Sequence, residues 1–352
     1  MKIAIITPGG ITNFGERAIM LGTVYDLREK YPSAQITIFG YQTLKDDDER
    51  LYKELEKLDV KYDSQLVNGS SFISKSFKIA GLLIYPKLFL PSHQYNYLKE
   101  ARIFSKGQES LTQSYGFIHF IDSFIEQLIA SRINKDISLY GHSIGPIYKY
   151  KRLCAFILHR FAKVYVRDSR SHELLLSLNY DETKIVDVKD LAYKAVEKYD
   201  LGELSKSKGH YLLVPNAAIC RTKEIEAQYI QNLHLLIKYL LLKKQKLIIG
   251  SSVITTDWNN DYRLCQRLKD DYPELELRHY MQLHEFLRDV KSAKMTISSR
   301  LHPLIMSNGL GTGVLAVSRS PKVIGLLTDL GLDQNIIDPF NKLNQKQVEA
   351  LL

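Results

Sequence analysis

The sequence is poor in cysteine, in long apolar runs and in the glycine motifs that usually bind nucleotides. Its three cysteines, Cys154, Cys220 and Cys265, are too few and too widely spaced for a disulfide framework or a CxxC metal site. The longest apolar stretch, residues 79–90, is interrupted by a proline and a lysine. It falls well short of the roughly 20 residues that a membrane span needs. These absences exclude a disulfide scaffold and a membrane-spanning protein, and they predict a cytoplasmic protein with reduced thiols.

Charged residues of both signs are frequent, but basic residues outnumber acidic ones. The 48 Lys and Arg against 39 Asp and Glu give a formal net charge of +9. Such a charge suits nucleic acid, an anionic membrane surface or a phosphorylated ligand. The sequence carries no nucleic-acid-binding motif and its basic residues are scattered among acidic ones, so we expect no nucleic-acid partner. A hydrophobic share of 45% over 352 residues predicts a folded protein with two cores.

Strand-like and helix-like segments alternate along the chain. An apolar run at residues 2–7 precedes a helical pattern over residues 16–30, and a second β-branched run follows at residues 35–39, as in a βαβ unit. This alternation predicts parallel strands covered by helices on both faces. We expect further strands at residues 117–121, 137–140, 164–166, 184–188, 211–214, 246–250, 276–278, 295–298 and 313–317.

A polar segment divides this pattern into two series. Residues 194–209 lack apolar periodicity and mark the expected linker. We therefore predict an N-terminal domain over residues 1–195 and a C-terminal domain over residues 205–352. The predicted fold class is α/β, with two doubly wound Rossmann-like domains that resemble the GT-B arrangement. Ligands of that arrangement bind in the cleft between the domains, at the carboxyl ends of strands.

The first candidate motif is the turn between the first strand and the first helix, residues 7–19. Its glycines allow backbone amides to face a ligand at a helix N-terminus, where an anion is stabilised by the aligned peptide dipoles. The turn matches neither GxGxxG nor GxxxxGK[ST]. Two interpretations therefore stay open, a ligand-binding turn and an ordinary βα turn.

Two further motifs follow strands of the N-terminal series. His142 and Ser143 lie between two glycines where a strand ends, so that they face the crevice of an open sheet or belong to a tight turn with a hydrogen-bonded histidine. Arg167 ends the next strand, and one of the two residues that follow, Asp168 or Ser169, has the position of a helix cap. We expect Asp168 to cap the helix and Arg167 to hold an anion through its bidentate guanidinium.

Arg300 and His302 form the most informative pair. A strand runs into Ser298 and Ser299, and Pro303 lies in the first turn of the helix that follows, a position that suits a residue without an amide hydrogen. Arg300 and His302 then flank a helix N-terminus, where one binds an anion and the other transfers protons near neutral pH. A structural histidine is the alternative interpretation.

Lys322 lies at a similar junction between strand and helix. Together with Arg319 it places positive charge at the start of a helix, against the direction of the helix dipole. An anionic ligand at this point would relieve that unfavourable arrangement. The alternative is an ordinary surface lysine.

Taken in order, these segments resemble the polysaccharide pyruvyl transferase family. The matching residues are 13–19, where the family usually has Gly-Asn-x-Gly-Asp, and then 141–146, 166–169, 300–302 and 321–323. The resemblance implies transfer of a pyruvyl group from phosphoenolpyruvate to two hydroxyls of a sugar, which forms a cyclic ketal and releases phosphate. It also implies that phosphoenolpyruvate is a co-substrate and that no cofactor or metal is needed.

The resemblance assigns roles to individual residues. His302 is the expected general acid toward the methylene carbon of the donor, and Arg300 with Arg167 is expected to hold its phosphate and carboxylate. Leu301, Ser299 and Lys322 complete the expected donor site, on the C-terminal domain. The expected acceptor side, on the N-terminal domain, is lined by Asn13, Phe14, Gly15, Glu16, His142 and Ser143.

The sequence departs from the family pattern in two places, and both concern the acceptor. Glu16 stands where the family has aspartate, and residues 117–124 replace a glycine-rich turn, so His119 and Asp122 line the acceptor site or merely end a strand. A second enzyme hypothesis is a GT-B glycosyltransferase that holds a nucleotide-sugar diphosphate with Arg300 and Lys322.

A lipid-linked acceptor would bring the protein to the inner face of the membrane. Residues 72–90 mix three lysines with Phe, Ile and Leu and predict a peripheral contact with anionic lipid. The alternative is a partly buried loop and helix.

Overall fold

The computed structural model describes residues 1–7, 13–40, 44–64, 66, 79–107, 111–113, 116–203, 209–219, 222–253 and 261–352, with the side chains of residues 44, 45, 118, 119 and 122 excepted. The chain divides into two compact units. The first contains Met1–Ile11 and Ala18–Ala195, and the second contains Thr12–Arg17 and Val196–Leu352. The division therefore falls once inside the first helix.

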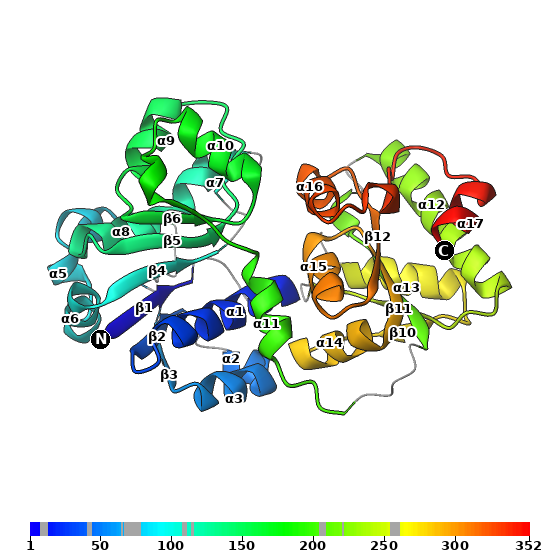
Figure 1. Cartoon of the computed structure of the whole chain (residues 1–352), viewed down its shortest axis with the longest axis horizontal. Helices are drawn as coiled ribbons and strands as arrows, with labels where there is room; N and C mark the ends of the chain where they lie inside the picture. Colours follow the sequence, from blue (N-terminus) through cyan, green and yellow to red (C-terminus); the bar gives the residue numbers. More distant parts are fainter. Residues whose placement is uncertain are drawn as a thin grey trace. The chain divides into compact units, whose positions relative to one another are not determined.

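The first unit is built on a seven-stranded parallel sheet in the order β3-β2-β1-β4-β5-β6-β7. Helices lie on both sides of this sheet (Figure 1). The strands are β1 (Lys2–Ile6), β2 (Gln35–Phe39), β3 (Val60–Asp63), β4 (Arg102–Lys106), β5 (Ile137–His142), β6 (Lys163–Val166) and β7 (Ile185–Asp187). The helices are α1 (Phe14–Lys30), α2 (Leu44–Asp47), α3 (Glu49–Lys57), α5 (Pro86–Phe89), α6 (Ser92–Glu100), α7 (Phe117–Asp122), α8 (Ile125–Ile133), α9 (Lys151–Leu158), α10 (Ser169–Ser177) and α11 (Leu191–Lys198).

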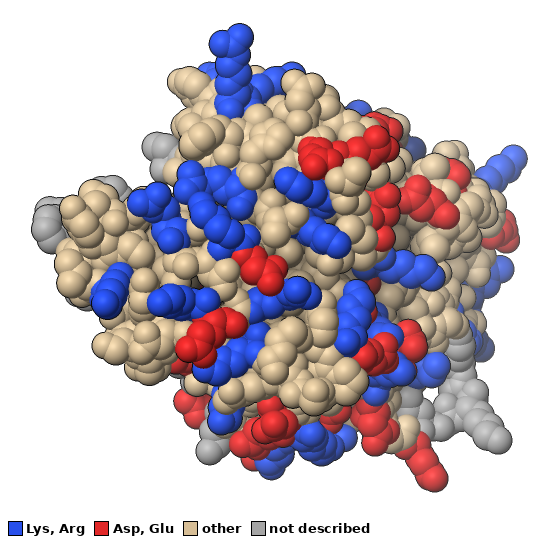
Figure 2. Space-filling view, turned by 60° about the vertical axis from the view of Figure 1, so that its left-hand side comes forward, with Lys and Arg blue, Asp and Glu red and all other residues tan. Residues whose placement is uncertain are grey.

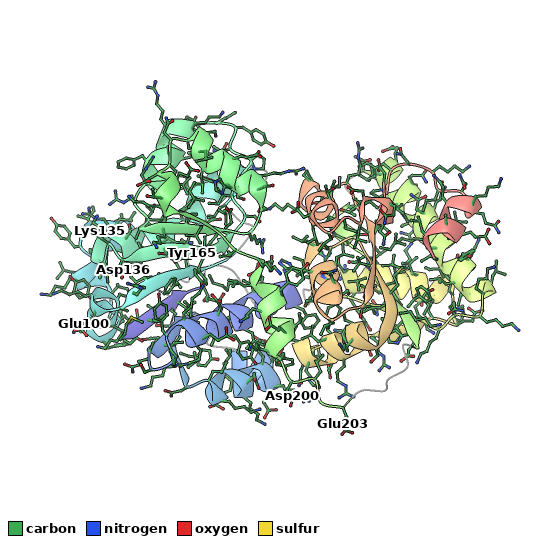
Figure 3. The ribbon with its side chains drawn as sticks, viewed as in Figure 1. Glu100, Lys135, Asp136, Tyr165, Asp200 and Glu203 are labelled. Carbon is green, nitrogen blue, oxygen red and sulfur yellow. The ribbon has the colours of Figure 1, made fainter. Side chains whose placement is uncertain are left out.

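Exposed ion pairs lie at the amino ends of strands in the first sheet. Glu100 and Asp136 lie just before β4 and β5 (Figure 3), and they pair with Lys2 at 2.6 Å and Arg102 at 2.9 Å. Exposed pairs of this kind contribute little to stability, and they occupy the amino ends of the strands. In open α/β sheets, ligands bind at the opposite, carboxyl ends.

The second unit contains a six-stranded parallel sheet in the order β10-β9-β8-β11-β12-β13. Its strands are β8 (His210–Val214), β9 (Leu247–Gly250), β10 (Glu276–Arg278), β11 (Ala293–Ser298), β12 (Gly313–Val317) and β13 (Ile336–Ile337). Its helices are α12 (Lys223–Leu242), α13 (Asp261–Asp271), α14 (Leu283–Ser292), α15 (Leu301–Gly309), α16 (Pro321–Asp329) and α17 (Gln345–Leu351). In both sheets the chain first winds to one side of the first strand and then continues on the other, as in a doubly wound fold.

Most of the predicted strands are confirmed, and the expected class of two doubly wound α/β units is correct. The prediction for residues 117–121 was wrong, because this apolar run forms α7 and sets Phe117, Phe120 and Phe124 against one another at helical spacing. The prediction also missed the strands β3, β4 and β13, and β4 is the one that lies between β1 and β5 in the sheet. Its Ser105 and Lys106 are fully buried, so its sequence does not alternate like that of an ordinary strand.

The expected linker is only partly irregular. Its first residues belong to α11, where Leu191, Ala192, Ala195 and Val196 are buried. The helical spacing of these residues was hidden by the polar residues that follow them, up to residue 209.

Residues 72–78 of the expected membrane-contacting segment lie outside the described residues. Within the part that is described, Ile84, Tyr85 and Leu88 are exposed at 59%, 62% and 77%, so the lipid contact stays a prediction. Among the helices that the structure describes, none is both long enough and apolar enough to cross a membrane.

Candidate active site at the carboxyl ends of β8 and β11

The strand order of the second sheet locates a crevice. The chain moves from β8 to β9 and β10 on one side and returns to β11 on the other, so the connections that follow β8 and β11 diverge at their carboxyl ends. A topological switch point of this kind is where open α/β sheets bind ligands. Asn216 follows β8, and Ser298, Ser299 and Arg300 end or follow β11.

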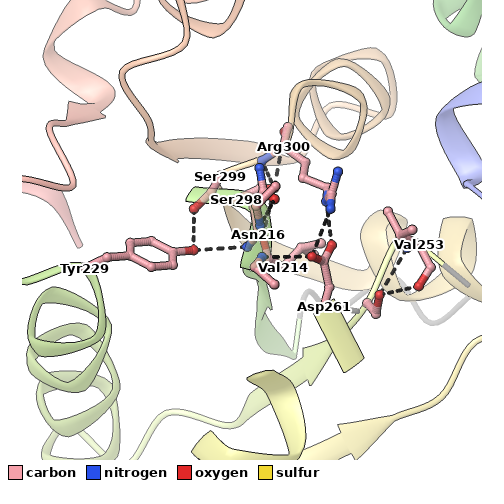
Figure 4. Close-up of polar contacts among 11 residues, drawn as sticks. Val214, Asn216, Tyr229, Val253, Asp261, Ser298, Ser299 and Arg300 are labelled. Atoms are coloured by element: carbon pink, nitrogen blue, oxygen red, sulfur yellow. Dashed lines mark hydrogen bonds and ion pairs between the residues drawn. The ribbon is translucent and has the colours of Figure 1, made fainter. Parts of the chain in front are cut away.

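Arg300 is held by a buried carboxylate. Its Nε and Nη2 both donate to the Asp261 side chain, with Nη2 at 2.9 Å from Oδ1 (Figure 4). Asp261 is fully buried, while the Arg300 side chain keeps 18% of its surface exposed. A planar guanidinium that is held at two points by one carboxylate has a fixed orientation. Arg300 therefore presents a pre-oriented positive charge at the crevice.

Hydrogen bonds also fix the two strand ends around Arg300. Ser298 Oγ accepts from the Arg300 amide at 3.0 Å and lies 3.1 Å from the Val214 carbonyl oxygen. The Tyr229 hydroxyl lies 2.7 Å from Ser299 Oγ and accepts from the Asn216 amide at 3.0 Å, which ties α12 to both strand ends (Figure 4). Ser299 is thus placed beside Arg300, with its hydroxyl already hydrogen-bonded to the protein.

His302 lies in the first turn of α15 and contacts the first turn of α1. A Cβ added to Gly15 would come within 2.7 Å of His302 Cβ and closer still to the imidazole ring. The ring therefore packs against the bare backbone of Gly15, and glycine is required here by space rather than by backbone angles. The structure thereby brings Asn13 to Glu16 next to the proposed proton donor, within the second unit.

The start of α1 is anchored to the second unit by several contacts. Asn13 Oδ1 accepts from the Glu16 amide at 3.1 Å and caps the helix, and the Phe14 amide donates to the Ser252 carbonyl oxygen at 3.0 Å. The Phe14 ring stacks on Phe286 with centroids 5.2 Å apart and is fully buried. The Phe14 ring is part of the packing, and the expected place of Phe14 on the acceptor side stays a prediction.

Lys322 occupies the first turn of α16, directly after β12. Since β12 is the neighbour of β11 in the sheet, Arg300 and Lys322 follow adjacent strands whose carboxyl ends lie at the same edge. Leu301, the first residue of α15, packs its side chain against the small cluster around Leu304. A donor contact of Leu301 would therefore use its backbone amide.

Arg167 lies in the first unit, in a buried network. Its Nη1 is 2.6 Å from Asp190 Oδ2, with side-chain exposures of 3% and 7%, and its Nε donates to Ser143 Oγ at 2.8 Å. Ser143 in turn donates to Asp168 Oδ2 at 2.7 Å. Asp168 Oδ1 accepts from the Ser171 amide at 2.9 Å and caps α10, which confirms the expected cap. The donor-binding role of Arg167 stays a prediction.

His142 is fully buried beside the same network. Its Nε2 lies 3.1 Å from the Ser105 carbonyl oxygen, which assigns the ring proton to that nitrogen. Burial lowers the pKa of His142 from 6.5 to about 3, opposed by the hydrogen bond to Ser105 and reinforced by the positive charges of Arg167 and Lys106. His142 is therefore neutral at physiological pH. The interpretation as a hydrogen-bonded histidine in a turn describes it best.

Three residues of the site escaped the sequence analysis. Asp261 looks like any acid at the start of a helix, and Tyr229 lies on the apolar face of α12, so that neither carries a motif. Asn216 is a loop residue two positions after a strand. Only the three-dimensional structure reveals these residues, because their contacts lie at the carboxyl ends of β8 and β11.

No group of three or more His, Cys, Asp and Glu side chains is arranged to hold a metal ion among the residues that the structure describes. The charged groups that the site offers to a ligand are Arg300, Lys322 and, when protonated, His302. They suit an anionic ligand.

Comparisons with known proteins identify a family and similar folds. A family model described as polysaccharide pyruvyl transferase matches residues 13–321, which include the start of α1 and both Arg300 and His302. The amylovoran biosynthesis protein AmsJ of Erwinia amylovora is 20% identical over 379 residues, covering 96% of this chain and 88% of that protein.

Solved structures with the same fold include UDP-GlcNAc 2-epimerases, which are GT-B-like. The enzyme of Methanocaldococcus jannaschii, in complex with UDP-GlcNAc and UDP, has a TM-score of 0.61 at 17% identity and covers 100% of this chain and 93% of its own. The Neisseria meningitidis enzyme bound to UDP-GlcNAc has a TM-score of 0.57 at 13% identity, covering 99% of this chain and 89% of its own. At these identities the likeness concerns the fold alone, and it confirms the expected GT-B-like class.

Proposed function

The chain belongs to the polysaccharide pyruvyl transferase family, and we propose that it transfers the pyruvyl group of phosphoenolpyruvate to two hydroxyls of a sugar, forming a cyclic ketal. The observation that carries the proposal is the meeting of Arg300, His302 and the first turn of α1 at the switch point of the second sheet. Arg300 supplies a fixed cation and His302 a proton, and both residues follow the same strand, β11. This pair matches a donor substrate that is held through its negative charges and protonated on carbon.

His302 is the general acid of the proposed reaction. Its imidazolium gives a proton to the methylene carbon of phosphoenolpyruvate, so the electron pair of the double bond becomes the new C–H bond. The neighbouring carbon then carries positive charge, and two sugar hydroxyls bond to it in turn while its bond to the phosphate oxygen breaks. One hydroxyl proton returns to His302 and the other leaves with phosphate, so atoms and charge balance.

Arg300 stabilises the departing phosphate. The Asp261 carboxylate fixes the guanidinium before the donor binds, so little reorganisation is needed as negative charge builds up on the phosphate. Lys322, at the end of the adjacent strand, adds a second cation, and the amides at the start of α15 favour an anion through the helix dipole. We assign Ser299 and the Leu301 amide to the same donor site.

The acceptor is a sugar of a glycan or of a lipid-linked oligosaccharide. Glu16 and the exposed edge of Asn13 lie in the helix turn that contacts His302, so they are placed to orient hydroxyls near the proton donor. His142 and Ser143 belong to the first unit, where their hydrogen bonds maintain the loop after β5. We assign these two residues to the support of that loop.

The competing proposal is a glycosyltransferase that uses a nucleotide sugar, and one experiment separates the two. Purified protein is incubated with phosphoenolpyruvate or with nucleotide sugars, each with a panel of mono- and oligosaccharide acceptors. Acceptor-dependent phosphate release, together with a product that has gained a pyruvyl ketal, supports the proposal. Sugar transfer from a nucleotide sugar, with no consumption of phosphoenolpyruvate, overturns it.

A further inference from the structure

Helix α9 and the loop before it expose an unusual group of side chains in the first unit. Tyr148, Tyr150, Leu153 and Phe156 are exposed at 67%, 62%, 44% and 63%. The opposite face of α9, with Cys154 and its neighbours Ile157 and Leu158, is buried in the core of the unit. The helix thus has one apolar face that packs inward and a second apolar group that faces solvent. We call the exposed residues between 148 and 156 the α9 surface.

The α9 surface is also strongly basic. Between residues 137 and 167 the sequence contains six Lys and Arg and no Asp or Glu. Lys149, Lys151 and Arg152 are exposed and alternate with the apolar residues of the surface. In Figure 2, Lys and Arg are more numerous than Asp and Glu over the upper left and middle of the face shown, with some acidic residues among them.

We propose that the α9 surface docks the protein onto an anionic lipid bilayer, with its aromatic and leucine side chains inserted at the level of the headgroups. Tyrosine, phenylalanine and leucine flanked by basic residues are the combination that favours the interface of a negatively charged membrane. Each Lys or Arg near such a surface strengthens binding about fivefold, and salt weakens this part of the interaction.

The same charges argue against a second copy of the chain as the occupant. A symmetric contact between two α9 surfaces would place Lys149, Lys151 and Arg152 against the same residues of the partner, which is unfavourable without an anion between them. An anionic bilayer interacts with both kinds of residue, because its headgroups attract the basic side chains and its interface accepts the apolar ones. The proposal goes beyond the pyruvyl transfer proposed above and does not depend on it.

Vesicle flotation with the full chain tests the proposal. The protein is mixed with vesicles of phosphatidylcholine alone or of phosphatidylcholine with phosphatidylglycerol, at low and high salt. We expect binding to the anionic vesicles only, weakened by salt. The Lys151→Glu/Arg152→Glu variant should bind at least about 25-fold more weakly, and Phe156→Ser should bind several-fold more weakly.

Matched controls lie in the second unit. Leu242→Ser removes a leucine that is 79% exposed, and Lys342→Glu/Lys346→Glu reverses two exposed lysines, and neither should change binding. Circular dichroism verifies that each variant is folded. Since the substituted side chains are exposed, loss of binding by a folded variant reports on the surface itself.

Three results would overturn the proposal. The first is that the wild type does not float with anionic vesicles. The second is that binding is unchanged in both α9 variants, or is lost only in Leu88→Ser, which would move the contact to the exposed residues around α5. The third is that the wild type is a dimer by light scattering, becomes a monomer with Phe156→Ser, and ignores vesicles.

Discussion

Gly15→Ala tests the contact between the start of α1 and His302. The added carbon would lie 2.7 Å from His302 Cβ, whereas carbon atoms in contact prefer about 3.5–4.0 Å. The imidazole must therefore move by about 1 Å, and a displacement of that size at a reacting group costs roughly 100-fold in rate. Alanine has no intrinsic difficulty at this helical position, where it is favoured over glycine by about 1 kcal/mol.

The assay separates catalysis from folding. We expect the turnover of phosphoenolpyruvate with an acceptor to fall about 100-fold. The affinity for phosphoenolpyruvate, measured by calorimetry, should fall much less, and the thermal unfolding temperature should change by only a few degrees. Gly325→Ala is the matched control, because this helical glycine has no atom within 4 Å of the added carbon. If Gly15→Ala keeps turnover within threefold of wild type, His302 does not depend on this contact and the site geometry described above is incorrect.

Three further predictions concern the titratable side chains that are buried, Asp261, Arg167 and His142. Asp261→Asn leaves Arg300 without its carboxylate. We therefore expect weaker binding of phosphoenolpyruvate and a loss of about 3 kcal/mol in the free energy of unfolding, measured by urea titration. No change in either quantity would contradict the role assigned to Asp261. Arg167→Met should destabilise the first unit by about 3 kcal/mol, and Arg167→Met/Asp190→Leu should recover most of that stability. If the double variant recovers stability but not the affinity for phosphoenolpyruvate, Arg167 contacts the donor. If it recovers both, the donor contact of Arg167 is refuted. His142 has a pKa lowered from 6.5 to about 3, so the unfolded chain binds a proton that the folded chain does not, and stability falls as the pH drops below 6.5. Between about pH 7.5 and about pH 5.5 this group accounts for about 1.4 kcal/mol, and urea titrations of His142→Gln should show a pH dependence smaller by that amount if the assignment is correct.

The overall fold was predictable because apolar periodicity follows the strands closely. The predicted strands at residues 35–39, 276–278 and 313–317 match β2, β10 and β12 residue for residue. The strand β4 escaped because Ser105 and Lys106 are buried polar residues, whose burial depends on partners elsewhere in the fold. Residues 117–121 were mistaken for a strand, since an apolar run of five residues fits either structure and only its neighbours decide.

The candidate site was predictable at its strand ends but not in its supporting contacts. Arg300, His302 and Lys322 lie where a strand passes into a helix, which is a pattern that the sequence displays. Asp261 reaches Arg300 across 39 positions of the chain, and nothing in its local sequence indicates that pairing. The placement of Gly15 against His302 joins residues 287 positions apart and was likewise invisible, although both motifs had been identified separately.

Product formation by His302→Ala tests the central claim most directly. Wild type and variant are incubated with phosphoenolpyruvate and the acceptor that supports turnover, and the pyruvyl ketal is quantified by mass spectrometry beside a calorimetric titration of the donor. The account predicts a loss of at least about 100-fold in ketal formation, with binding of phosphoenolpyruvate largely retained through Arg300 and Lys322. Ketal formation by His302→Ala at a rate close to that of wild type would contradict it.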